Sequence, residues 1–153
     1  MTLLLATFGV ALASAWIPVI PIEAYIGGAV AESSQSWWAL ALAATIGQMF
    51  GKIFIFELGR QSMDWAWLQR RMAKYDVEKY VTRLTEASER RPYVSDLVVL
   101  GSAVVGIPPF AVVSLVAGQL RVSLTRFLVW GSIGRFIRFA AVALGVAQLV
   151  DVF

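Results

Sequence analysis

The sequence predicts an all-α polytopic membrane protein of two inverted repeats, each a re-entrant helical hairpin followed by a transmembrane helix. Apolar residues make up 59% of the 153-residue chain and charged residues 15%, with a mean hydropathy of +0.72. Soluble domains are about half apolar and a quarter charged. Two apolar stretches are broken by prolines at matching places. We therefore expect one membrane domain with a first repeat (1–59), an amphipathic cytoplasmic connector (60–96) and a second repeat (97–153).

The first hairpin is centred on Ile17 to Gly28, IPVIPIEAYIGG. Pro18 and Pro21 each remove a backbone donor and disfavour helix in the residue before them. Glu23 would cost about 2.5–3.5 kcal/mol on insertion scales if lipid surrounded it. Broken backbone and charge are tolerated at membrane depth only where protein or a water-filled cavity covers them. The stretch is therefore predicted to be a hairpin tip that lines a polar cavity.

The arms of this hairpin are expected at Thr2 to Ala15 and Tyr25 to Ala31, and two alternatives stay open. Leu3 to Ala31 is long enough to be one crossing helix kinked at the prolines, since a crossing needs about 20 apolar residues. Residues 2–15 also end in a small-residue pattern similar to a signal-peptidase site. A signal peptide has a basic region before its apolar core, and the first Lys or Arg here is Lys52.

A polar turn, ESSQS, follows and leads into Trp37 to Gly59, a predicted transmembrane helix. The paired tryptophans at its start are typical of a membrane interface. Its charged residues, Lys52 and Glu57, lie toward the far end. Lys52 either extends outward to the headgroups or contributes to the cavity.

The connector is more polar, with eight of the thirteen Lys and Arg and six of the ten acids. One apolar helical face, typical of a helix lying on lipid headgroups, is formed by Trp65, Leu68, Met72 and Tyr75. A second helix is expected after an N-cap at Asp76 and should end at Pro92. The alternative is a basic patch for a protein partner or nucleic acid.

The second repeat begins with Leu97 to Gly118, which is broken at Gly106, Pro108 and Pro109. A final helix is expected from Ser123 to about Val152.

Arg135 and Arg138 share one face of that helix, at i and i+3. Arg135 lies roughly 18 Å along from Ser123 at 1.5 Å per residue, well inside the membrane.

The two halves correspond at an offset of 87 residues: Pro21 matches Pro108, Ile46 matches Ile133 and Gly47 matches Gly134. Each half has one net crossing, so the second half enters from the opposite face. This is the plan of many secondary transporters, which bind substrate near the midplane at discontinuous helices. The glycines, Gly27, Gly28, Gly47 and Gly51, are expected to permit close helix packing.

The positive-inside rule places residues 60–96 in the cytoplasm. Residues 32–36 and both termini then face outward, and they contain no Lys or Arg. Arg121 and Arg126 return to the inner side.

Residues 16–60, with IPVIPIEAYIGG and AATIGQMFGKIFIFELGR, and residues 104–145, with VVGIPPF, VAG, RFL and GRFIRF, resemble the DedA / VTT (SNARE-associated Golgi protein) superfamily. The short bacterial YqaA-type branch is the most similar. The resemblance implies two facing re-entrant hairpins in a lipid transporter of the bacterial inner membrane. It also implies lipid phosphate such as undecaprenyl phosphate as cargo, and a role in envelope homeostasis.

The resemblance further implies that Glu23 is the embedded acid protonated during transport, and that Arg135 and Arg138 lie near the basic positions of the final helix. Two positions depart from the family. Gln48 stands where many members have Asp, and the second hairpin motif, SAVVGIPPF, lacks the family's arginine.

The chemistry of the residues agrees in outline with a lipid phosphate as partner. A phosphate crossing hydrocarbon needs a basic group, and the planar guanidinium suits it. Arg135 and Arg138 are the candidates, with Lys52 second. Glu23 would hold the arginines when the site is empty and release them when protonated, or it simply pairs with one of them to hold the hairpins together.

Other functions are less well supported by the residues. The chain has no cysteine and no histidine, which removes disulfides, thiol catalysis and the usual proton shuttle and metal ligands. We expect no enzyme activity, metal, cofactor or nucleic-acid partner. The alternative to a transporter is a membrane adaptor acting through residues 60–96. A homodimer is compatible with so small a membrane domain.

Overall fold

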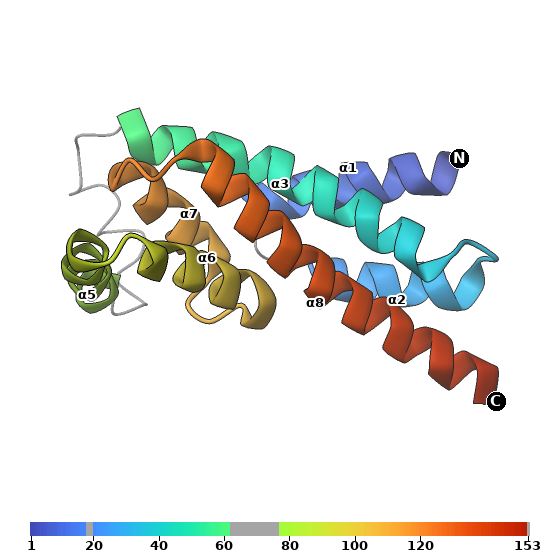
Figure 1. The fold of residues 1–153 in the computed structure, drawn as a ribbon. Helices are drawn as coiled ribbons and strands as arrows, with labels where there is room; N and C mark the ends of the chain where they lie inside the picture. The colour runs from blue at the N-terminus through green and yellow to red at the C-terminus, as the bar shows by residue number, and fades with distance from the viewer. Residues whose placement is uncertain (18–19, 62–76, 153) are drawn as a thin grey trace.

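The computed structural model describes residues 1–17, 20–61 and 77–152 (Figure 1). These residues form helices and no strands, as the all-α prediction requires. The helices are α1 (Thr2–Trp16), α2 (Ile22–Glu32), α3 (Trp37–Gln61), α5 (Val77–Arg90), α6 (Tyr93–Val105), α7 (Phe110–Gln119) and α8 (Leu124–Val152).

The chain reverses direction between α1 and α2, so the N-terminus and the end of α2 lie at the same end of the molecule (Figure 1). The two helices contact one another. Pro21 is the N-cap of α2, whereas Pro18 lies outside the described residues. Helices α1 and α2 therefore form a helical hairpin and not a single kinked helix.

The second apolar stretch reverses in the same way between α6 and α7 (Figure 1). Gly106 ends α6 with φ of +83°, a left-handed conformation that favours glycine. Pro109 is the N-cap of α7, and the carbonyl of Pro108 accepts a 2.6 Å hydrogen bond from Ser102 Oγ. The helix breaks thus fall at the prolines and glycine that the sequence singled out.

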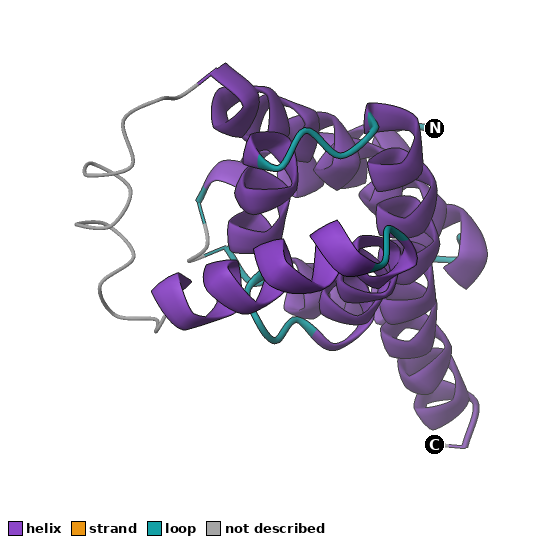
Figure 2. Cartoon of the chain, turned by 60° about the vertical axis from the view of Figure 1, so that its left-hand side comes forward, coloured by secondary structure: helices purple, strands orange, loops and turns teal. Residues whose placement is uncertain are grey.

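The hairpins pack on the two long helices in a crossed arrangement. Helix α1 lies on α3 and α6 lies on α8, so each first arm packs against the long helix of its own half. Helix α2 lies on α8 and α7 lies on α3, so each second arm packs against the other half. The long helices contact each other and run in opposite directions (Figure 1). Figure 2 shows the C-terminal part of α8 projecting from this bundle.

Several glycines allow backbones to approach closely. A Cβ on Gly59 of α3 would lie 2.1 Å from the carbonyl oxygen of Leu115 in α7, and a Cβ on Gly47 would lie 2.4 Å from that of Phe8 in α1. Gly51 likewise packs on Ala15. Close packing was also expected at Gly28, and that prediction is wrong. Gly28 is exposed on α2, and a Cβ added there would have no neighbouring atom within 4 Å. Gly27 makes only an ordinary contact.

Large apolar side chains face outward along the long helices. Helices α3 and α8 are both long and apolar enough to cross a membrane. The exposed stripe of α3 consists of Trp38, Leu42, Ile46, Phe50, Phe54 and Leu58. It extends over about 30 Å at 1.5 Å per residue, the thickness of a bilayer's hydrocarbon core. Such a surface is stable when lipid covers it.

Both termini lie at one end of the molecule and α5 lies at the other (Figure 1). Helix α5 ends at Arg90, just before Pro92, as predicted. The apolar face predicted from Trp65 to Tyr75 and the N-cap predicted at Asp76 lie outside the described residues.

Replacing Gly59 with alanine should lower stability by about 1–3 kcal/mol, because the new methyl group would overpack the contact between α3 and α7. The matched control is Gly28→Ala, which meets open space. It should be neutral or slightly stabilising, since alanine favours helix over glycine by up to about 1 kcal/mol. Thermal unfolding in detergent micelles measures both variants. Equal midpoints for the two would contradict the packing assigned to Gly59.

Candidate functional site

An ion pair connects the first hairpin to the last helix. Arg138 Nε of α8 donates a 2.8 Å hydrogen bond to Glu23 Oε1 in the first turn of α2. The side chains of Arg138 and Glu23 are 29% and 32% exposed, so both are only partly buried. Of the two arginines that the sequence offered as partners for Glu23, Arg138 makes the contact.

The same guanidinium also holds the second hairpin. Arg138 Nη1 donates to the carbonyl oxygens of Val105 at 2.7 Å and Val104 at 3.2 Å. Helix α6 ends at Val105, so these carbonyls have no partner within the helix, and a cation is favoured at this end of the helix dipole. A Cβ on Gly106 would lie only 2.8 Å from Nη1, so glycine leaves room for the arginine.

Lys52 makes the corresponding contact at the first hairpin. It is only 4% exposed, and its Nζ donates a 2.9 Å hydrogen bond to the carbonyl oxygen of Ala15 in the last turn of α1. Of its two predicted positions, the inward one is therefore observed and the extension to the headgroups is wrong. Lys52 of α3 and Arg138 of α8 thus each cap the C-terminal end of the hairpin helix that packs on their own helix.

Arg135 lies between these contacts without an anionic partner. It is 7% exposed, and its guanidinium carbon lies 4.6 Å from the ring centre of Phe110. Its Nε is buried and unpartnered, and no described residue forms a hydrogen bond or ion pair with the guanidinium. Its charge is repelled by Arg138 and Lys52 and attracted by Glu23.

Gln48 presents a buried acceptor that is also unused. Its Nε2 donates to Ser14 Oγ at 3.2 Å, and that hydroxyl donates in turn to the carbonyl of Ala11 at 2.8 Å. The Ser14 proton is committed, so the amide of Gln48 must present its NH₂ group to Ser14. Oε1 is thereby left as a buried acceptor without a partner.

The start of α7 adds to the positive potential near Arg135. This helix begins at Phe110, and it has neither a side-chain cap nor an acidic residue in its first turn. Helix α2, in contrast, carries Glu23 in its first turn. Free N–H groups at a helix N-terminus favour anions, so the guanidinium and the helix end together form an anion-attracting region.

The structure thus joins Glu23 to Arg138 in an ion pair and places Arg135 within electrostatic range of both and of Lys52. Gln48 lies about one helical turn before Lys52 on α3. Sequence reasoning missed Phe110 and Ser14. Phe110 stands 87 residues after Glu23, so the repeat offset marks it. Ser14 is a polar residue in the apolar first arm, and it was interpreted there as part of a cleavage-site pattern.

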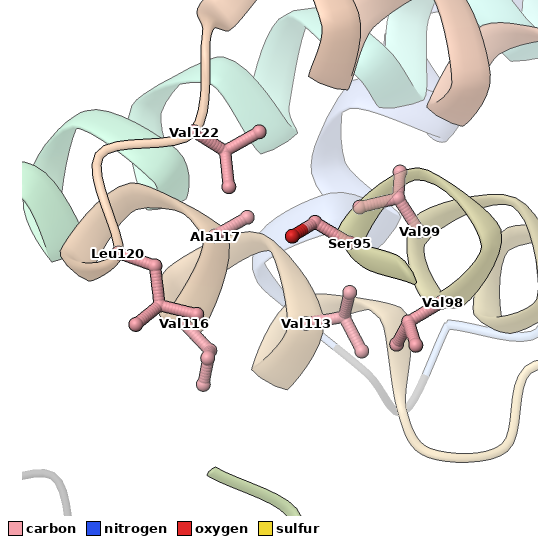
Figure 3. Close-up of a pocket in the computed structure, with 8 residues that line it drawn as sticks. All are labelled: Ser95, Val98, Val99, Val113, Val116, Ala117, Leu120 and Val122. Carbon is pink, nitrogen blue, oxygen red and sulfur yellow. The ribbon is translucent and has the colours of Figure 1, made fainter. Parts of the chain in front are cut away.

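A small pocket between α6 and α7 is separate from this cluster (Figure 3). None of the charged candidates lines it. Its lining is apolar except for Ser95. The other lining residues are Val98, Val99, Val113, Val116, Ala117, Leu120 and Val122.

The model of the VTT domain family matches residues 2–148, nearly the whole chain. No curated protein and no solved structure matches.

The pair of Glu23 and Arg138 should show strong energetic coupling in a double-mutant cycle. Glu23→Gln, Arg138→Gln and the double variant should give a coupling free energy of about 1–3 kcal/mol, because one side chain alone leaves a partly buried charge unpaired. The control cycle uses Glu57 and Arg60, a more exposed pair at 3.8 Å, where about 0–0.5 kcal/mol is expected. Unfolding in detergent measures both, and coupling no larger than the control would contradict the proposed joint.

Proposed function

The chain belongs to the VTT domain family, and from that membership we propose that this membrane protein is a lipid transporter for a lipid phosphate. In this proposal Arg135 binds the phosphate and Glu23 controls the hairpins. The cargo is of the class of undecaprenyl phosphate, an amphiphile with an anionic phosphate on a long hydrocarbon chain. The membrane is the inner membrane of a bacterium.

The observation that carries the proposal is the unpaired guanidinium of Arg135. Moving a charge from water into a protein interior costs several kcal/mol unless a partner compensates, and ionisable groups inside membranes normally have one. Here the cluster holds three cations and one carboxylate, and Arg138 already uses that carboxylate. An anionic ligand would supply the missing partner, and the planar fork of arginine suits a phosphate.

The arrangement of the helices supports transport. Helices α3 and α8 run antiparallel, and the two hairpins pack on them in the same crossed way. This is what an inverted repeat with re-entrant hairpins would give. The hairpin helices, at 10–15 residues, are short of the roughly 20 residues that one crossing needs. Inverted repeats with broken helices at the midplane are typical of alternating access.

Arg138 has a different role in this proposal from Arg135. Its Nε and Nη1 are engaged by Glu23 and by the end of α6. Protonation of Glu23 would remove the charge that attracts Arg138 and so loosen α2 from α8. The proposal therefore takes a proton as the coupling ion.

The orientation follows from charge. The end of the molecule that carries α5 also carries the turn with Arg121, and the opposite end carries both termini (Figure 1). By the positive-inside rule the first of these ends, with the connector, is cytoplasmic.

Arg135→Gln should slow lipid movement by about 10- to 100-fold, because hydrogen bonds to a charged group contribute about 1.5–3 kcal/mol. The assay follows flipping of a fluorescent polyprenyl phosphate in proteoliposomes, with and without a pH gradient. Arg60→Gln, an exposed change at the end of α3, should leave the rate unchanged. A normal rate for Arg135→Gln would contradict the role of Arg135. No movement of polyprenyl phosphate or phospholipid by the unsubstituted protein would reject transport in favour of a membrane adaptor.

The same Arg135→Gln variant should be as stable as the original protein, or more stable by about 1–3 kcal/mol, when no ligand is present. The reason is that it removes a buried charge without a partner. Thermal unfolding in lipid-phosphate-free detergent measures this. Marked destabilisation would instead assign Arg135 a structural role.

A further inference from the structure

Two buried polar atoms of opposite hydrogen-bonding type are unused on the two long helices. Among the described residues, the buried side-chain atoms without a hydrogen-bond partner are Arg135 Nε and Gln48 Oε1. The first is a donor and the second is an acceptor. Their side chains are 7% and 5% exposed, and an unmet buried polar group is costly. The proposed phosphate site uses the Arg135 donor but gives the Gln48 acceptor no role.

The packing of α8 on α3 fixes the level at which Arg135 lies. The two helices run antiparallel, and a Cβ on Gly131 of α8 would lie 2.9 Å from Cε of Met49 in α3. About two turns further along α8, Phe139 belongs to the same buried cluster as Ala44 of α3. Arg135 is midway between Gly131 and Phe139, about one turn from each on the same helical face. It therefore faces the turn of α3 between Ala44 and Met49.

Gln48 belongs to that turn of α3 and is buried there. About one turn after it comes Lys52, which is also buried and lies within electrostatic range of Arg135. The Nε2 atom of Gln48 is held by Ser14 Oγ of α1 at 3.2 Å. Because the oxygen and nitrogen of a planar amide diverge, Oε1 is directed away from Ser14. The free acceptor on α3 and the free donor on α8 thus lie at one level of the bundle.

We propose that Gln48 selects phosphate monoesters over phosphodiesters at the Arg135 site. A ligand that satisfies both free atoms must accept a hydrogen bond from Arg135 and donate one to Gln48. The monoanion of a phosphate monoester does both, because it has charged oxygens and one P–OH group. A phosphodiester has the same charge but no hydroxyl, so it would leave Oε1 buried and unpartnered. Sites built to bond a hydroxyl reject analogues that lack it.

The inference rests on the proposed function and names its specificity-determining residue. Arg135 alone would bind either kind of ester, and the glycerophospholipids that form a bilayer are phosphodiesters. A lipid phosphate therefore has to be distinguished from an excess of similar anions. A neutral amide suits this task, because it accepts a hydrogen bond without neutralising the cation. A carboxylate at position 48 would instead offer Arg135 an ion-pair partner within the protein and so compete with the phosphate.

A comparison of two small esters tests the selection. Butyl phosphate and butyl methyl phosphate are titrated into the full-length protein in maltoside micelles and followed by ³¹P NMR. The pH is about 5.5, below the second pKa of a phosphate monoester at about 6, so both ligands carry one negative charge. The protein's own groups, Glu23 included, are in the same state for both. The monoester should bind about 10- to 100-fold more tightly, the effect of one hydrogen bond to a charged group.

The variant Gln48→Met removes the acceptor at nearly constant volume. The monoester should weaken to the level of the diester, while the affinity for the diester stays unchanged. The matched control is Thr45→Val on the same helix. Thr45 is also buried, and its hydroxyl bonds to the carbonyl of Ala41 in its own helix at 2.7 Å. This variant should keep the preference for the monoester.

The outcomes separate failure of the inference from failure of the proposed function. If the unsubstituted protein binds both esters equally, the phosphate site stands but Gln48 Oε1 is satisfied by water alone, and the inference is overturned. It is also overturned if the preference for the monoester persists in Gln48→Met. If neither ester binds the unsubstituted protein, the phosphate site at Arg135 fails and the selection fails with it.

Discussion

The contacts on which the rest of the structure depends are those that Arg138 of α8 makes with two other helices, α2 and α6. Its guanidinium, presented by α8, holds Glu23 at the start of α2 and the last carbonyls of α6. In hydrocarbon no water is present to satisfy the carbonyls at a helix end, and the residues after Gly106 include two prolines, which have no N–H to donate. A side chain must therefore supply the donors. Lys52 does the same for Ala15 at the end of α1, so both helix breaks are stabilised from the long helices.

The two halves resemble each other in backbone but differ in charge. Positions 87 residues apart carry Gln48 and Arg135 on the long helices, and Glu23 and Phe110 at the starts of the second arms. Glu23 forms an ion pair, whereas Phe110 offers Arg135 only the face of its ring. An aromatic face contributes less to a cation than a carboxylate does. The excess positive charge at Arg135 follows from this difference, and in our account the site takes up an anion there.

Much of the fold was predictable because its signals are local. Prolines and glycines mark where the helices break, and the length of the apolar segments predicted the two long helices, α3 and α8. The site was predictable only in part, since pairing depends on how the hairpins cross between the two halves. Arg135 and Arg138 are equivalent candidates in the sequence, three residues apart on one face. In the structure, however, Arg138 is hydrogen-bonded and ion-paired, whereas Arg135 has neither kind of partner among the described residues. The inward position of Lys52 likewise depends on where α1 ends in space, and no pattern in its own helix shows that.

The central claim is that Arg135 and not Arg138 binds the phosphate, and a solid-state NMR distance measurement tests it most directly. The protein, with ¹⁵N-labelled arginine, is reconstituted with a polyprenyl phosphate, and dipolar coupling between guanidinium ¹⁵N and lipid ³¹P is recorded. We predict that one arginine couples to phosphorus and that its signal disappears in Arg135→Gln while the Arg138 signal remains uncoupled. Coupling that survives in Arg135→Gln, or that arises from Arg138 alone, would contradict the account.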